Sequence, residues 1–279
     1  DIALRALRSN KAVLCEKPMT MNATQTMILI DASRKNNTPL MEAFMYKSHP
    51  QTLKVCEILK ESFKSPLTID AEFRFKVEVP ESHRLVNREL GGGSILDIGC
   101  YPMSISRLAV GKVNGKDFLN PNGIECESEL NSQGVDLNAQ ANLTFEDGST
   151  AHIKSATNLA SESTVTIKDA SNTLIINQPW HCGEYTERAS SLELQLGSSE
   201  FETIEISTEK GIYAIEIEHF EELIEAGNIE SEIVPHNDSH GNMIALDRWR
   251  KGSGVYYESD KGENVTGPLF SFDIKENRK

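Results

Sequence analysis

The sequence predicts an α/β region followed by a larger α+β region, whose mainly antiparallel sheet carries helices on one face. Residues 1–46 alternate between helical and strand segments, which is typical of the end of a doubly wound parallel sheet. After Pro66, segments that alternate apolar and polar residues follow one another with few helices between them, as in antiparallel strands with one solvated face. Apolar residues make up 38% of the 279 residues, so the chain can bury a sizeable core.

Apolar spacing and turn residues divide the first 63 residues into five elements. Asn22 is a suitable N-cap for one of them, because its side chain can accept a hydrogen bond from a backbone amide of the first helical turn. Ala23, Met27 and Ile30 contribute to the buried side of that helix. The predicted elements are a helix ending near residue 10, a strand at 11–15, a helix at 22–35, a strand at 39–44 and a helix at 50–63.

Alternation of period two predicts a series of strands from residue 68 onward, with turn residues such as Asp147-Gly148 between them. A helix at 96–110 interrupts the series, and helices at 213–226 and 238–250 follow it. We expect the face of the sheet without helices to pair with a second copy of the chain, since a large exposed apolar face is rarely tolerated in a monomer. The predicted strands are 68–77, 124–132, 139–146, 149–157, 163–168, 172–177 and 201–206.

Charge and cysteine content exclude several classes of partner. The formal net charge is −14, with the acidic residues spread along the second half, which argues against nucleic acid or an anionic membrane surface. The five cysteines form no Cys-x-x-Cys pair and no zinc-binding spacing, so we expect reduced thiols and no metal. Apolar runs are shorter than the roughly 20 residues needed to span a bilayer, and a cytoplasmic protein is the interpretation that fits.

The segment Cys15-Glu16-Lys17-Pro18 places charged residues where a buried parallel strand ends. The apolar run Ala12-Val13-Leu14 precedes it, and proline stops the strand. In open α/β sheets, ligands bind at the carboxyl ends of the strands. Lys17 is therefore a candidate functional residue, although a strand-end lysine is by default a solvated surface charge.

A second motif, Gly91-Gly92-Gly93-Ser94-Ile95-Leu96-Asp97-Ile98-Gly99-Cys100-Tyr101-Pro102, is a glycine-rich entry to a helix. Asp97 and Tyr101 are four residues apart, about one helical turn, so we expect them to point the same way. Together with Lys17 they supply the groups for moving a proton on and off an oxygen while a cofactor moves a hydride. The alternative is that Tyr101 is a core aromatic residue and Asp97 only caps or charges the start of the helix.

In this order and spacing, the two motifs resemble the Gfo/Idh/MocA family of NAD(P)-dependent oxidoreductases. Two further segments carry the resemblance, residues 41–50 (Met-Glu-Ala-Phe-Met-Tyr-Lys-Ser-His-Pro) and 238–247 (Asp-Ser-His-Gly-Asn-Met-Ile-Ala-Leu-Asp). Many family members have histidine at the position of Tyr101. The tyrosine is similar to the branch that contains glucose-fructose oxidoreductase, D-xylose dehydrogenase and dimeric dihydrodiol dehydrogenase.

The resemblance implies roles for six residues. Lys17 would hydrogen-bond the reacting oxygen and help to relay its proton, and Tyr101 would be the general acid or base, helped to ionise by a neighbouring cation such as Lys17. Asp97 would orient Lys17 or a substrate hydroxyl. The predicted cofactor contacts are Glu16, Lys17 and Pro18, and the predicted substrate contacts are Arg84, Asp97 and Tyr101. Arg84 could equally be a surface residue.

Two other positions near these motifs are open to a structural interpretation. His49 could touch the nicotinamide side, but we favour a cap of the helix that starts at Pro50. Lys47 stands where the family usually has arginine, which keeps the charge but loses the bidentate fork.

The chain departs from the family in lacking the Gly-x-Gly-x-x-Gly turn that holds a pyrophosphate on a helix N-terminus. Its first residues already have the pattern of a helix within a fold. We therefore interpret it as an N-terminally incomplete sequence of an enzyme from which on the order of 100 residues, a few βαβ units, are absent. The expected divisions are a remnant of a Rossmann domain at 1–46, an α+β substrate and oligomerisation domain at 47–237, a helix returning to the nucleotide domain at 238–258, and a tail at 259–279.

For the enzyme, the resemblance implies NAD(P)-dependent oxidation or reduction at a secondary alcohol of a sugar, polyol or cyclic diol, with NADP favoured over NAD. Its partners would be that small molecule and at least one further copy of itself. Two alternatives stay open: a non-catalytic sugar or nucleotide sensor on the same fold, and a truncated, inactive oligomerising domain. Retention of both Lys17 and Tyr101 weighs against a sensor, which needs no proton relay.

Overall fold

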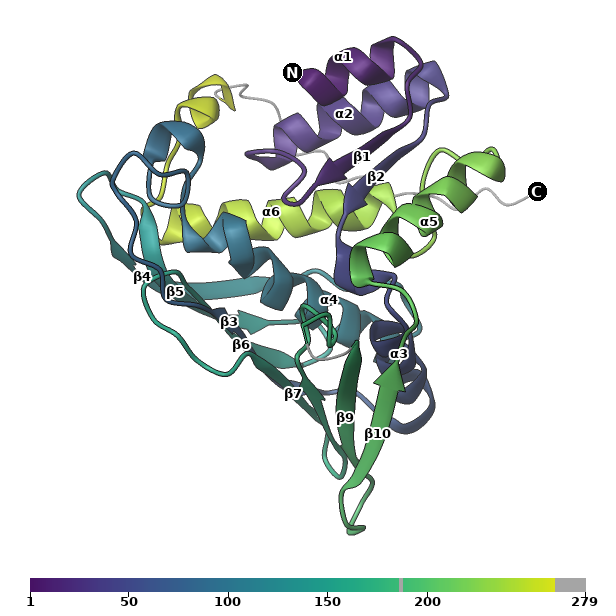
Figure 1. Cartoon of the computed structure of the whole chain (residues 1–279). Helices are drawn as coiled ribbons and strands as arrows, with labels where there is room; N and C mark the ends of the chain where they lie inside the picture. Colours follow the sequence, from purple (N-terminus) through teal and green to yellow (C-terminus); the bar gives the residue numbers. More distant parts are fainter. Residues whose placement is uncertain (186–187, 264–279) are drawn as a thin grey trace.

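Two short parallel strands and two helices form the N-terminal unit of the computed structural model, which describes residues 1–185 and 188–263. Strand β1 (Val13–Glu16) pairs in parallel with β2 (Leu40–Ala43), and helices α1 (Ile2–Arg8) and α2 (Ala23–Asn36) lie beside them (Figure 1). Asn22 caps α2 as predicted, since its side-chain oxygen accepts a hydrogen bond from Gln25 N at 2.9 Å. Such a cap typically contributes about 1 kcal/mol.

The rest of the chain is organised around an eight-stranded sheet, as the alternation pattern predicts. The strand order is β10-β9-β8-β7-β3-β6-β5-β4, and every neighbouring pair is antiparallel except β3 and β6. The strands are β3 (Thr68–Arg74), β4 (Gly123–Leu130), β5 (Asp136–Thr144), β6 (Thr150–Ala156), β7 (Thr164–Lys168), β8 (Thr173–Asn177), β9 (Ala189–Gln195) and β10 (Glu202–Ser207).

The helices lie on the side of this sheet that faces the N-terminal unit, with α6 running between the two (Figure 1). Those other than α5 cover the apolar face, where side chains such as Ile69, Ile153 and Ile167 are fully buried, and α5 packs against Met41 of β2. The longer helices are α3 (Pro50–Ser62), α4 (Cys100–Val113), α5 (Ile212–Glu225) and α6 (His236–Gly252), and the short helical turns are η1 (Met45–Lys47), η2 (Arg88–Leu90), η3 (Ile95–Gly99) and η4 (Glu258–Glu263).

The opposite face of the sheet is polar, which corrects part of the sequence-based reasoning. Asp70 on β3 lies beside His152 and Lys154 on β6, with nitrogen to oxygen distances of 3.1 and 3.2 Å, and Gln140 on β5 is the register partner of Lys154. The expectation of a large exposed apolar face is therefore wrong. Pairing of two copies through this face stays a prediction, and the interface would be a polar one.

Most predicted elements agree with the structure to within a few residues, and three differ. Strand β3 ends at Arg74 instead of 77, with an isolated bridge from Lys76 to Asn158 beyond it. Strand β9 was not predicted, although Leu192 and Leu194 are buried at alternate positions. The predicted helix at 96–110 begins with a wide π-type turn before α4. Most of the predicted tail, residues 264–279, lies outside the described residues.

Helix α6 fastens the N-terminal unit to the large sheet domain through buried charges. Near its C-terminal end, Asp247 Oδ2 accepts a hydrogen bond from Ala23 N, at the start of α2, at 2.9 Å. Near its N-terminal end, Asp238 pairs with Lys47 of η1, and with Arg107 of α4 at 2.7 Å. Because η1 follows β2 and α4 carries Tyr101, helix α6 fixes the two halves of the predicted site relative to each other.

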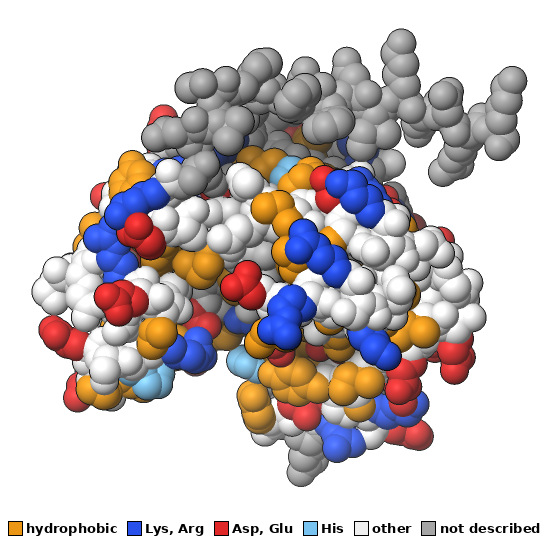
Figure 2. Space-filling model, turned by 90° about the horizontal axis from the view of Figure 1, so that it is seen from above, with side chains coloured by type: hydrophobic (Ala, Val, Ile, Leu, Met, Phe, Trp, Pro, Cys, Tyr) orange, Lys and Arg blue, Asp and Glu red, His pale blue; other side chains and the backbone are white. Residues whose placement is uncertain are grey.

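Two general expectations about the surface can be compared with the structure. Basic and acidic side chains are interspersed over the face seen in Figure 2, without one large basic patch. Across residues 1–185 and 188–263, we find no helix that is both long enough and apolar enough to cross a membrane.

Candidate active site at the end of strand β1

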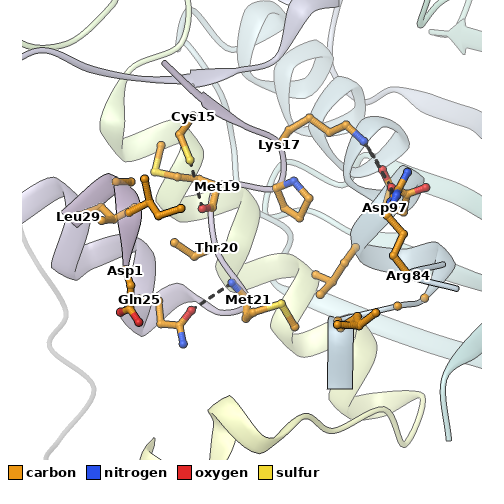
Figure 3. A pocket seen from close by; sticks show the side chains of 18 of the residues that line it. Asp1, Cys15, Lys17, Met19, Thr20, Met21, Gln25, Leu29, Arg84 and Asp97 are labelled. Carbon is orange, nitrogen blue, oxygen red and sulfur yellow. Dashed lines mark hydrogen bonds and ion pairs between the residues drawn. The ribbon is translucent and has the colours of Figure 1, made fainter. Parts of the chain in front are cut away.

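Lys17 follows β1 directly and its side chain reaches the helix that carries Asp97 and Tyr101. Its Nζ donates a hydrogen bond to the carbonyl oxygen of Asp97 at 2.5 Å and lies 3.9 Å from Asp97 Oδ1 (Figure 3). The same Nζ is 5.0 Å from the centre of the Tyr101 ring, within the range of a cation–π contact. The structure therefore brings the three predicted catalytic residues together from segments about eighty positions apart in the sequence.

A side chain of strand β2 hydrogen-bonds the turn that carries Lys17. The peptide bond between Lys17 and Pro18 is cis, and the next amide, Met19 N, donates to Glu42 Oε1 at 3.0 Å. Glu42 is 4% exposed, and burial raises the pKa of its carboxyl group. Glu42 lies in one of the segments that resemble the family, but its spacing in the sequence gives no sign of this contact. In the structure, it fixes the backbone two residues beyond Lys17.

A wide helical turn makes the Asp97 carbonyl available to Lys17. In a π-type turn each carbonyl bonds to the amide five residues later. For Asp97 that residue is Pro102, which has no N–H group. The Asp97 carbonyl oxygen accepts a hydrogen bond from the Lys17 ammonium at 2.5 Å and a longer one from Cys100 Sγ at 3.6 Å. The π-type turn is thus part of the site geometry, which a simple four-residue helical spacing did not anticipate.

Arg84 approaches the site from the irregular segment before the glycine run. Its Nη1 lies 3.1 Å from Asp97 Oδ1, and its side chain is 66% exposed. Asp97 therefore contacts two cations, Lys17 through its backbone oxygen and carboxylate and Arg84 through its carboxylate (Figure 3). This exposed pair contributes little stability by itself, which leaves Arg84 available to a ligand.

Tyr101 lies in a buried aromatic cluster, with 3% of its surface exposed. The ring centres of Phe44, Phe73 and Trp180 are 4.9, 5.3 and 5.5 Å away. Burial raises the pKa of its phenol well above the usual value near 10. The expectation that Lys17 would bring the phenol closer to ionisation is therefore wrong for the protein alone, since loss of solvation outweighs the nearby ammonium. The phenol is held in its protonated form.

A cavity of about 930 Å³ opens beside Lys17, between the N-terminal unit and the glycine run. Lys17, Pro18, Arg84 and Asp97 line it, whereas Tyr101 and Glu16 do not. The cavity walls also carry the apolar side chains Met19, Met21, Leu85, Leu90 and Leu96. A space of this size, with an ammonium at one end and apolar walls, fits the flat ring of a nicotinamide.

Glu16 is exposed at the surface, so of the three predicted cofactor contacts Lys17 and Pro18 face the cavity. A loop of glycine amides that could hold a pyrophosphate is not found in the described part of the chain, and the sequence has no Gly-x-Gly-x-x-Gly segment. The groups that line the cavity near β1 are therefore an ammonium, a proline ring and apolar side chains, which fit a nicotinamide ring. In residues 1–185 and 188–263 no group of three or more histidine, cysteine, aspartate or glutamate side chains could hold a metal ion.

His49 and Lys47 have structural positions. His49 Nδ1 accepts a hydrogen bond from Gln51 N at 3.1 Å and so caps α3, as we favoured. Burial lowers the pKa of its imidazole to about 4. Lys47 is 3% exposed and pairs with Asp238 in the interior, away from the lining of the cavity.

Comparison with known proteins gives the same family along both regions of the chain. Residues 1–44 match the model "Oxidoreductase family, NAD-binding Rossmann fold", and residues 65–171 match "GFO/IDH/MocA C-terminal domain". The chain belongs to the Gfo/Idh/MocA family of oxidoreductases.

Curated family members are similar to this chain over part or most of its length. A D-xylose 1-dehydrogenase (NADP(+)) from Haloferax volcanii is 26% identical over 253 residues, which are 91% of this chain and 72% of that protein. A trans-1,2-dihydrobenzene-1,2-diol dehydrogenase from Xenopus tropicalis is 37% identical over 133 residues, or 45% of this chain and 39% of that protein.

Among solved structures, KijD10, a 3-ketoreductase from Actinomadura kijaniata in complex with NADP and TDP-benzene, has a TM-score of 0.76 at 24% identity. The match covers 92% of this chain and 75% of that one. An aldose-aldose oxidoreductase from Caulobacter crescentus, complexed with glycerol, has a TM-score of 0.75 at 19% identity, over 91% of this chain and 73% of that one. These structures share the Gfo/Idh/MocA fold with this chain, and the chain spans about three quarters of their length.

Proposed function

We propose that the protein is an NAD(P)-dependent oxidoreductase that transfers a hydride between nicotinamide and a secondary alcohol of a sugar, polyol or cyclic diol. The observation that carries this proposal is the meeting of Lys17, Asp97 and Tyr101 beside a cavity with apolar walls. A non-catalytic sensor would have no use for an ammonium held by Asp97 against the ring of a tyrosine.

Each of the three residues has a chemical role in this proposal. Lys17 hydrogen-bonds the reacting oxygen of the substrate and offsets the negative charge that develops on it. In the reduction direction Tyr101 gives its proton to that oxygen, and oxidation is the reverse transfer. The phenol of Tyr101 is protonated before substrate binds, as a proton donor must be, and the Lys17 ammonium would offset the negative charge that the transfer leaves on it. Asp97 holds the Lys17 side chain in place through its carbonyl oxygen.

The nicotinamide, when bound, supplies or accepts the hydride. Lys17 and Pro18 would contact it at the end of β1, with Leu96 among the apolar side chains of the wall. Arg84, which is exposed at the rim, and Asp97 would contact hydroxyl groups of the substrate. We favour NADP because the Haloferax relative is described as NADP-dependent and the KijD10 structures contain NADP.

The KijD10 structures add support for the catalytic pair. They include forms in which one lysine is replaced by alanine or glutamate and one in which a tyrosine is replaced by phenylalanine. In that protein, the lysine and the tyrosine are separated by the same number of residues as Lys17 and Tyr101. The equal spacing supports Lys17 and Tyr101 as the residues at the corresponding positions of this chain.

The test is a steady-state assay of the full-length protein against a panel of aldoses and diols, with nicotinamide fluorescence to measure cofactor binding. Tyr101→Phe should lower turnover on the order of 10²–10⁴-fold with little change in cofactor affinity. Tyr46→Phe is the matched control, since Tyr46 belongs to the same aromatic cluster, with its ring centre 5.8 Å from that of Tyr101. Its hydroxyl donates a hydrogen bond to Ser104 Oγ. Near-normal turnover of Tyr101→Phe, or an equal loss in both variants, would overturn the assignment.

A further inference from the structure

Asp136, at the start of β5, lies beneath the first turn of the helix that bears Asp97 and Tyr101. We propose that it is a positioning residue, which ties this turn to the sheet and so sets the distance between that helix and Lys17. Its catalytic consequence rests on the function proposed above. Its structural consequence, the fixed start of the helix, can be measured without any substrate.

The contacts of Asp136 converge on one oxygen. Its Oδ2 accepts hydrogen bonds from Ser94 Oγ at 2.8 Å and from Ile95 N at 2.6 Å. Asp136 and Ser94 are both fully buried. The Ser94 hydroxyl also lies 2.9 Å from Ser155 Oγ on β6. The first turn is therefore attached to two neighbouring strands of the large sheet.

This attachment differs from an ordinary helix cap. Ser94 occupies the N-cap position, where a serine hydroxyl normally accepts a hydrogen bond from an amide of the first turn. Here the Ser94 side chain makes no such bond, and the Ile95 amide is bound by a carboxylate more than 40 positions later. A local cap would satisfy the amide but leave the helix free to shift. A cap supplied by the sheet satisfies the amide and fixes its location.

The glycine run provides the space for this contact. Gly93 has φ +131°, and a Cβ at this position would collide with Asp136 Oδ1. One residue earlier, the carbonyl oxygen of Gly92 accepts a hydrogen bond from Tyr257 OH at 2.5 Å. The last glycine of the run, Gly93, is thus explained by close packing onto Asp136 and Tyr257.

The cost of burying Asp136 indicates a role beyond stability. Its Oδ1 has no hydrogen-bond partner, and a buried polar atom without a partner is destabilising because it loses its hydrogen bonds to water. A serine or threonine could cap the helix at lower cost. What the carboxylate adds is one oxygen that holds a backbone amide and a side-chain hydroxyl at once.

The experiment compares Asp136→Ala, Asp136→Asn and the control Asp147→Ala. Asn keeps an oxygen that can accept both hydrogen bonds, whereas Ala removes it. Asp147 sits in the turn between β5 and β6 and also accepts several hydrogen bonds, including those from Ser65 and Ser149, but it contacts no residue of the site. Its loss therefore reports a purely structural effect.

Hydrogen exchange is the first readout. In Asp136→Ala the backbone amides of residues 95–101 should exchange roughly 5–30-fold faster than in the unchanged protein, the factor expected for a lost cap. They should be nearly unchanged in Asp136→Asn and in Asp147→Ala. Unchanged exchange at 95–101 in Asp136→Ala overturns the positioning role, whether or not the protein is an enzyme.

Steady-state kinetics of the full-length protein is the second readout. Asp136→Ala should lower kcat on the order of 10²-fold, the effect of a displacement of about 1 Å, with a much smaller change in the KM for the dinucleotide. Asp136→Asn should restore most of kcat. Equal losses in kcat for Asp136→Ala and Asp147→Ala would overturn the proposal. Absence of activity in the wild-type protein would refute the proposed function, and hydrogen exchange alone would then decide whether Asp136 positions the helix.

Discussion

Asp238 is the carboxylate whose loss should cost the fold most among the buried charges. It is 4% exposed and pairs with two buried cations, Lys47 at 3% and Arg107 at 0% exposure. Arg107 Nη1 also donates to the backbone oxygen of Asp238 at 3.2 Å, while its Nη2 has no partner. The substitution Asp238→Asn keeps the shape of the side chain but leaves both cations without their shared counter-charge.

The expected magnitude follows from that geometry. Removal of one partner from a buried ion pair typically costs 3–5 kcal/mol. Glu42 is also buried and interacts electrostatically with Lys47, so it offsets part of the uncompensated charge. We therefore expect the lower end, about 3 kcal/mol in the free energy of unfolding, which corresponds to a fall in Tm of roughly 6–12 °C.

Equilibrium unfolding in urea, followed by tryptophan fluorescence, measures this change, since Trp180 and Trp249 are both buried. The control is Glu218→Gln, which breaks the exposed pair with Lys210 at 2.7 Å and should change stability far less than Asp238→Asn, because solvent screens that pair. If Asp238→Asn costs no more than Glu218→Gln, the buried network does not hold the two parts of the molecule together as we argue.

Two further predictions concern Gly93 and His49. Gly93→Ala should destabilise the protein by on the order of 1–3 kcal/mol, because the positive φ of Gly93 and its contact with Asp136 both oppose a side chain. Gly115 has open space around it, so Gly115→Ala should destabilise the protein less. Thermal unfolding of both variants measures the difference. Burial lowers the pKa of His49 from 6.5 to about 4, so the unfolded chain binds more protons between these values and stability should fall as pH drops from about 6.5 toward 4. His49→Asn keeps a helix cap, so unfolding curves at several pH values should show a shallower loss of stability in this variant. An unchanged dependence of stability on pH would contradict the prediction. Some dependence will remain, because burial also lowers the pKa of His181, His219, His236 and His240.

Local chemistry was enough to predict most of the elements and to single out Lys17 at the end of a strand. The cap at Asn22 and the turn after Lys17 depend on side chains and φ preferences within a few residues, and both were predicted. The convergence of Lys17 with Asp97 and Tyr101 depended on the family resemblance, since nothing in the spacing of these residues fixes the contact between the segments.

Features that depend on distant segments were missed. The support of Met19 by Glu42 and of Ile95 by Asp136 has no sequence signature, because each requires a neighbouring strand to pass beneath a particular turn. The pKa of Tyr101 was predicted in the wrong direction because the aromatic cluster that excludes water from it includes Phe73 and Trp180, which come from other parts of the chain. Polar residues such as Lys154 are visible in the sequence of the strands. Only the register of the strands shows that they lie together on the open face of the sheet.

The position of helix α6 has a consequence for synthesis of the protein on the ribosome. Lys17 and Tyr101 emerge early, but the helix that fastens their two supports together, through Asp238 and Asp247, begins only at residue 236. A nascent chain that stops before this helix contains the site residues but lacks the contacts of Asp238 and Asp247 that align them. The active geometry should therefore appear in one step late in translation, and nascent chains released before α6 should lack it.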